Sequence, residues 1–145
     1  MKNIMVALDF EENSRTLLNK AKEIGEKFNA KIWILHVAAP QPEFIGYETG
    51  PQYVRDFRAI DLKREHKLLQ QYSNLMKADG LDSEGLLISG ESVSTIVEKA
   101  KSLNIDMVII GHHHHGLIYK AFVGGTDTKI LNRIEVPVLI VPLPY

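Results

Sequence analysis

Five short, mostly apolar runs constrain the fold of this 145-residue chain more than any other feature. They lie at residues 4–8, 32–37, 85–89, 107–110 and 138–141, and the run at 85–89 is the weakest. Continuous apolar runs of this length are typical of parallel strands covered by helices on both faces, because a half-solvated strand alternates polar and apolar residues. The sequence therefore predicts an α/β fold with an open, doubly wound, five-stranded parallel sheet and helices on both faces, a Rossmann-like architecture.

Four stretches with helical spacing of apolar residues separate these runs. The first follows a cap at Asn13 or Ser14 and closes at residues 29–30. The second covers residues 52–77, either as one long helix or with a break near Asp61. The third follows residues 90–92, and the fourth follows residues 124–127, where two glycines and a capping side chain precede apolar positions at helical spacing. Strands and helices therefore alternate along the whole chain.

Composition and charge exclude several classes of function. The chain has 17 basic and 18 acidic residues and a formal net charge of -1, so nucleic acid and anionic membranes are poor partners. It has no cysteine, which excludes a disulfide framework, a thiolate metal site and a cysteine nucleophile. Asp9 interrupts the first apolar run, so that run is neither a secretory signal nor a membrane span. We expect a single cytoplasmic domain over residues 1–145.

Asp9, Val37 and Gly111 each stand at the end of a predicted strand. Ligands of doubly wound sheets bind at the carboxyl ends of the strands, so we expect these three residues to line one crevice. Gly124 and Gly125 precede a predicted helix start, where free N–H groups and partial positive charge favour an anion. The pattern predicts a phosphate cradle at this edge of the sheet.

Taken together, these residues resemble the universal stress protein family over essentially the whole chain. The matching segments are the first strand with Asp9, the LHV that ends at Val37, the DMVIIG that ends at Gly111, and the closing VPVLIVP. The resemblance implies the strand order 3-2-1-4-5 and a small stress-response module. It also implies a homodimer through the last strand, formed by Val138, Leu139, Ile140 and Val141.

The nucleotide-binding branch of that family has the motif G-x2-G-x9-G followed by Ser or Thr. In this chain the motif is degenerate, because His114 replaces the second glycine and Gly125 takes the hydroxyl position. His114 could block the phosphate path or donate to a phosphate oxygen, and Thr126 could replace the missing hydroxyl. The GHH at Gly111 also resembles the family's other branch, whose members do not bind ATP detectably.

If the nucleotide branch applies, the resemblance implies a ligand such as ATP or AMP, with Mg²⁺ only in company with the nucleotide. The binding residues would then be Ala7, Asp9, Val37, Ile110, Gly111, His114, Gly124, Gly125 and Thr126.

Several of these residues also have simpler structural interpretations. Asp9 serves equally well as a helix-cap carboxylate on local grounds, and the family resemblance favours a ribose or adenine contact. His36 is expected to be a core or edge residue, and the histidine run at residues 112–115 is not expected to bind metal, because adjacent loop side chains diverge.

No nucleophile elbow, Walker lysine or paired carboxylates occur in the sequence, so we predict no catalytic residues. Three classes of function remain: a stress module with weak adenine-nucleotide binding, a dimeric interaction protein with a vestigial pocket, and a slow nucleotide hydrolase.

Overall fold

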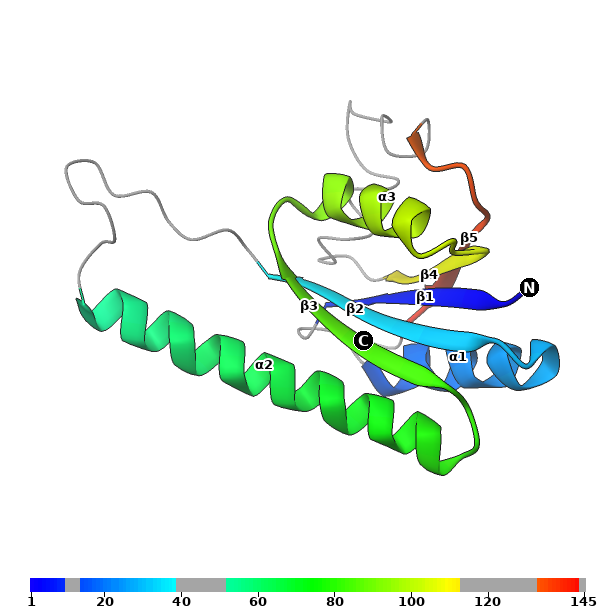
Figure 1. Cartoon of the computed structure of the whole chain (residues 1–145), viewed down its shortest axis with the longest axis horizontal. Coiled ribbons are helices and arrows are strands. Elements are labelled where there is room, and N and C mark those ends of the chain that lie inside the picture. Colours follow the sequence, from blue (N-terminus) through cyan, green and yellow to red (C-terminus); the bar gives the residue numbers. More distant parts are fainter. Residues whose placement is uncertain (10–13, 39–51, 113–132, 144–145) are drawn as a thin grey trace.

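Five parallel strands form one sheet in the computed structural model of the chain, which describes residues 1–9, 14–38, 52–112 and 133–143 (Figure 1). The order across the sheet is β3-β2-β1-β4-β5, and each neighbouring pair is parallel. The predicted α/β class is confirmed, and so is the strand order that the family resemblance implied. The strands are β1 Asn3–Leu8, β2 Lys31–Ala38, β3 Ser83–Ser89, β4 Met107–His112 and β5 Val138–Pro142.

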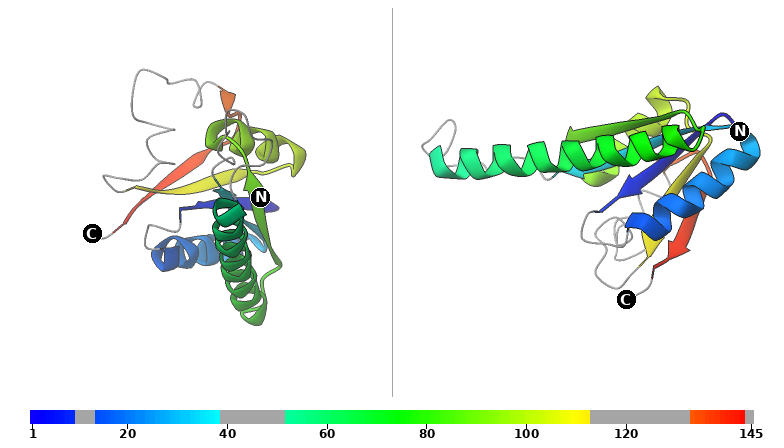
Figure 2. Two further views of the ribbon diagram at one scale, coloured as in Figure 1. Left: turned by 90° about the vertical axis from the view of Figure 1, so that its left-hand side faces the viewer. Right: turned by 90° about the horizontal axis from the view of Figure 1, so that it is seen from below.

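Three helices are described, and they cover both faces of the sheet. They are α1 Ser14–Phe28, α2 Gln52–Ala78 and α3 Ser92–Ser102. Helices α1 and α2 lie on one face and α3 on the other (Figure 2). Helix α2 is continuous, so the alternative of a break near Asp61 is wrong. The predicted fourth helix falls mostly on residues 113–132, which lie outside the described residues.

The core lies on both sides of β1. Ile4, Val6 and Leu8 pack with α1 and α2, whereas Met5 and Ala7 pack with α3. All five side chains are at most 2% exposed, which explains why this strand is a continuous apolar run. Full burial of one of the four larger side chains stabilises the fold by about 1.5–3 kcal/mol.

The two edge strands, β3 and β5, are less buried than β1. Among the described strands, β3 pairs only with β2 and β5 pairs only with β4. Pro137 precedes β5 and Pro142 ends it, as expected of an edge strand, since proline cannot donate to a sheet. The edge positions that the implied order 3-2-1-4-5 gives to these two strands are therefore confirmed.

At the amino ends of the strands, the carboxylate of Asp106 ties β1 to the start of β4. Its Oδ2 accepts from the backbone N–H of Asn3 at 2.9 Å and of Lys2 at 2.7 Å. These hydrogen bonds lower the pKa of Asp106 below its ordinary value, and the bond from Asn3 has the largest effect. The indole Nε1 of Trp33 donates to Asn3 Oδ1 at 3.1 Å, so β2 is tied to the same point.

Replacing Asp106 with asparagine should lower the free energy of unfolding by about 0.5–1 kcal/mol at neutral pH, a small effect because the side chain is exposed. Because the folded-state pKa is depressed, the stabilisation is present above the unfolded value of 3.8 and is lost as pH falls through the folded pKa. The difference between wild type and Asp106→Asn should therefore shrink as pH falls below about 4. Urea unfolding followed by the fluorescence of Trp33, the only tryptophan, measures it.

Asp82→Asn is the matched control, because Asp82 is exposed in the turn before β3 and loses the same charge. It should change the unfolding free energy by less than about 0.5 kcal/mol. Equal losses in both variants would show that net charge, and not the two backbone hydrogen bonds, determines the effect.

Candidate functional site

The carboxyl ends of β1, β2 and β4 meet at one edge of the sheet (Figure 1). Asp9 directly follows β1, Val37 is the next-to-last residue of β2, and Gly111 is the next-to-last residue of β4. The chain order reverses at β1, with β2 on one side and β4 on the other, and this is where doubly wound sheets bind ligands. These three predicted site residues thus lie at the strand ends where a ligand is expected.

Three apolar members of the predicted site share the face of the sheet that α3 covers. Ala7, Val37 and Ile110 come from β1, β2 and β4, and all pack in the same hydrophobic cluster. Ala7 and Ile110 are almost fully buried, whereas Val37 and the neighbouring Asp9 are partly exposed. We call these three residues the apolar wall: Val37 is its accessible surface beside the Asp9 carboxylate, and Ala7 and Ile110 support it from within the core. An apolar surface next to a carboxylate suits a heteroaromatic base with polar substituents.

The phosphate-binding part of the predicted site is only partly described. Gly111 is buried within β4 and pairs with Val141 of β5. His114, Gly124, Gly125 and Thr126 lie outside the described residues, so their role in a phosphate cradle stays a prediction.

The amino terminus of α3 cannot serve as a free anion site, because Glu91 caps it. The carboxylate of Glu91 accepts from Val93 N at 2.9 Å and from Ser94 N at 2.8 Å. The pKa of Glu91 lies below its ordinary value, and the hydrogen bond from the backbone of Ser94 is the largest cause. An ionised carboxylate at these N–H groups repels phosphate, so a nucleotide here would need the helix start predicted after Gly125.

His36 and Glu65 form a contact that the sequence did not predict. His36 Nδ1 lies 2.9 Å from the carbonyl oxygen of Leu8, directly before Asp9. A carbonyl oxygen only accepts, so Nδ1 carries hydrogen and Nε2 faces Glu65 Oε1 of α2 at 3.7 Å. The side chains are only 13% and 17% exposed, and Glu65 Oε2 has no hydrogen-bond partner among the described residues. His36 is thus more than a core or edge residue, because it links β1 to α2 beside the predicted site.

Two kinds of site are absent from the part of the chain that the structure describes. No group of three or more His, Asp or Glu side chains there is arranged to hold a metal ion. No described helix is long and apolar enough to cross a membrane. The prediction for the histidine run at residues 112–115 falls almost entirely outside this part.

A family profile and several known relatives match this chain over nearly its whole length. The profile of the "Universal stress protein family" matches residues 1–142. "Universal stress protein A" of Photorhabdus laumondii is 28% identical over 147 residues, with 98% of this chain and 95% of that protein covered. The protein of the same name from Escherichia coli K12 is 27% identical over 146 residues, with coverages of 98% and 94%.

Solved structures of universal stress proteins share the fold at lower identity. The Lactobacillus plantarum protein has a TM-score of 0.76 at 15% identity, with 97% of each chain covered. An Arabidopsis thaliana family protein with AMP bound has a TM-score of 0.69 at 18% identity, with coverages of 99% and 93%. A universal stress protein in complex with cAMP has a TM-score of 0.64 at 22% identity, with coverages of 99% and 98%.

We expect a double-mutant cycle of His36→Asn and Glu65→Gln to give a coupling energy of about 0.5–1.5 kcal/mol. Asparagine retains a donor near the position of Nδ1, so the cycle isolates the Nε2 contact with the carboxylate. Urea unfolding measures the coupling, and a value of zero would show that the contact between the two side chains does not stabilise the fold.

Proposed function

The chain belongs to the universal stress protein family, and from this premise we propose that it is a stress-response protein that binds an adenine nucleotide weakly at the carboxyl edge of its sheet. The proposal rests on one observation: the apolar wall of Ala7, Val37 and Ile110 lies beside Asp9 where the strand order reverses. Structures with the same fold hold AMP or cAMP, which supports a nucleotide as the ligand.

Adenine and ribose would use the described part of this site. The base would pack against Val37, the partly exposed member of the apolar wall, with Ala7 and Ile110 beneath it. Asp9 would accept hydrogen bonds from a ribose hydroxyl or from the adenine amino group, since an ionised carboxylate only accepts. This arrangement favours a nucleotide over a simple sugar, because the wall has no polar group to match a sugar face.

The phosphates would lie along Gly111, His114, Gly124, Gly125 and Thr126, and the composition of this loop sets the affinity. Gly125 lacks the hydroxyl of the family motif, a loss of about 0.5–1.5 kcal/mol, or up to roughly tenfold in affinity. His114 adds a ring where the motif has glycine, so its steric effect decides whether binding is weak or absent. Mg²⁺ would enter only on the phosphates of a bound nucleotide.

The alternative function is that of a dimeric interaction protein with a vestigial pocket. The observation that favours it is the open edge of β5, where Ile140 is 39% exposed and the strand has one described neighbour. A twofold copy would satisfy the backbone groups on that edge and cover this side chain. A slow nucleotide hydrolase is the third candidate, and turnover of a labelled nucleotide would distinguish it from the other two.

Replacing His114 with glycine tests the nucleotide proposal directly. If the ring obstructs the phosphates, the variant should bind ATP more tightly by calorimetry, by up to about tenfold. If the imidazole is itself a phosphate ligand, His114→Gly should bind more weakly, and most clearly at low pH, where histidine is protonated.

Asp9→Ala is the companion variant, and it should abolish binding in either background, because it removes the acceptor for ribose or base. The nucleotide proposal fails if neither wild type nor His114→Gly binds ATP, ADP or AMP at millimolar concentration. The dimeric interaction protein would then be the better account.

The proposed dimer is tested by Ile140→Asp, which places a charge at the centre of the open β5 edge. We expect monomers in sedimentation velocity at concentrations where the wild type is dimeric. Ile60→Asp is the matched control, because Ile60 is 62% exposed on α2 rather than on β5, and it should stay dimeric. A persistent dimer in Ile140→Asp would place the interface elsewhere.

A further inference from the structure

The outer edge of β3 presents backbone groups that the described sheet does not use. The backbone N–H of Ile32 donates to Asp82 O at 2.9 Å, which fixes the phase of the β2–β3 ladder. In a parallel ladder, alternate residues direct both of their backbone groups toward the same neighbour. Because Asp82 points its backbone groups toward β2, every second residue from Ser83 onward points its N–H and C=O away from β2, toward the open edge. These outward-facing residues include Ser83, Gly85 and Leu87.

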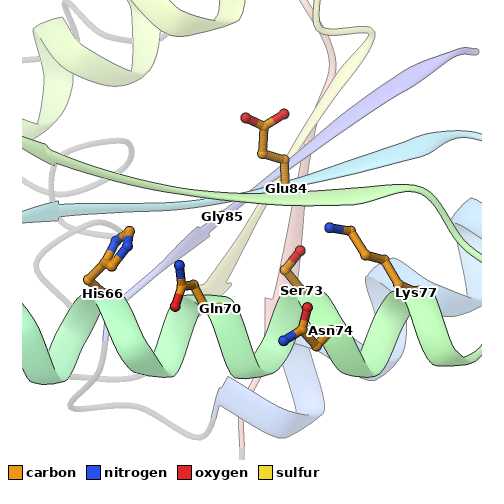
Figure 3. Close-up of a pocket in the computed structure, with 7 residues that line it drawn as sticks. All are labelled: His66, Gln70, Ser73, Asn74, Lys77, Glu84 and Gly85. Atoms are coloured by element: carbon orange, nitrogen blue, oxygen red, sulfur yellow. The ribbon is translucent and has the colours of Figure 1, made fainter.

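A groove runs along this edge between β3 and α2, with a volume of about 420 Å³ (Figure 3). Its helical side consists of His66, Gln70, Ser73, Asn74 and Lys77. We call it the α2–β3 groove. The side chains that line the groove are polar, whereas α2 and β3 pack in the core through apolar side chains. The groove is therefore a feature of the surface and not a gap in the core.

Gly85 fixes the distance between the helix and the strand at the floor of the groove. A Cβ at Gly85 would lie 3.0 Å from Leu69 Cβ and 3.1 Å from Leu69 O of α2. Only glycine therefore permits this close approach without a shift of the helix backbone. The same absence of a side chain leaves bare β3 backbone beside the polar face of α2.

The charges along the groove favour an acidic ligand. The Lys77 side chain points back along α2 toward Ser73 and β3 (Figure 3), and Lys77 has no ion-pair partner among the described residues. Glu84 is the only carboxylate of the lining; it points to the opposite side of β3 from α2 and pairs with Lys31 at 3.1 Å. The helical wall thus offers a cation, a histidine and two amides, and no carboxylate.

The dimensions of the groove match an extended peptide. His66 and Lys77 stand three helical turns apart, about 16 Å along the axis. About five residues of extended chain span the same length. Strand β3 has seven residues, Ser83–Ser89, so it is long enough to pair along this whole distance.

We propose that the α2–β3 groove docks an extended acidic segment of a partner protein, which adds to the sheet as a sixth strand beside β3. The segment's backbone pairs with Gly85 and Leu87, one of its carboxylates lies against Lys77, and its polar side chains meet the amides of Gln70 and Asn74. Strand addition of this kind takes affinity from main-chain hydrogen bonds and selectivity from the side chains beside the edge. This surface is separate from the nucleotide site and from the β5 edge.

The test uses a capped seven-residue peptide of alternating glutamate and valine, because valine favours the extended conformation. Titrated into the ¹⁵N-labelled full chain, it should shift the amide resonances of Gly85 and Leu87. Lys77→Glu should weaken binding by about fivefold to tenfold, since it replaces an attraction with a repulsion. Lys67→Glu is the matched control, because Lys67 is exposed on the same helix but does not line the groove, and it should change affinity by less than about twofold.

Two further arms separate docking from a structural effect of the substitution. A peptide with lysine in place of glutamate should bind Lys77→Glu better than wild type, a reversal that mere loss of folding cannot produce. The glutamate peptide N-methylated on the amides of one edge should lose binding, because that edge can no longer donate to β3.

Three outcomes would overturn the proposal. Equal binding of the N-methylated peptide would exclude strand addition, and equal weakening by Lys77→Glu and Lys67→Glu would indicate unspecific charge attraction. No resonance shift at millimolar peptide would show that the groove does not accept an acidic strand at all.

Discussion

The burial of β1 on both faces is the constraint on which the rest of the structure depends. Helices α1 and α2 cover one face of residues Ile4 to Leu8, and α3 covers the other. A polar side chain at any of these positions would be buried without a partner, at a large cost in free energy. Along β1, polar groups can therefore appear only where the strand ends. Asp9 is the first polar side chain after the buried run, and the position where it emerges is the point of strand reversal.

That same constraint explains how far the sequence predicts the fold. Strands β1, β2 and β4 are predicted to within one or two residues, because two-sided burial produces a continuous apolar run. Strand β3 is also predicted to within two residues, since it begins at Ser83 and the predicted run begins at Gly85, although its mostly half-buried side chains leave a weaker apolar signal. The uncertainty about a break in α2 has a similar origin, since side chains on both sides of Asp61 are exposed or only half-buried and give no clear period.

The candidate site is predictable where it depends on topology and unpredictable where it depends on packing. Parallel strands bring their carboxyl ends to one edge, so the sequence alone is enough to group Asp9, Val37 and Gly111. The contact between His36 and Glu65 is different, because it depends on where α2 crosses β2, and no local spacing encodes that crossing. The choice of nucleotide as ligand comes from the family resemblance, since the residues alone leave Asp9 equally suited to capping a helix.

Helix α2 lines the α2–β3 groove and, through the contact of Glu65 with His36, also reaches the strand ends where we propose that a nucleotide binds. Binding at one of these surfaces could therefore change the other. Near the carboxyl edge, α2 is held by Glu65 against His36. One turn later Leu69 packs against Gly85, where even a methyl group would approach the helix backbone to 3.1 Å. The absence of a side chain at Gly85 lets helix and strand pack directly on each other, and close-packed interiors transmit displacements. We therefore expect a shift of α2 near Glu65 to reach the groove, with the Leu69–Gly85 contact as the point through which it passes to β3.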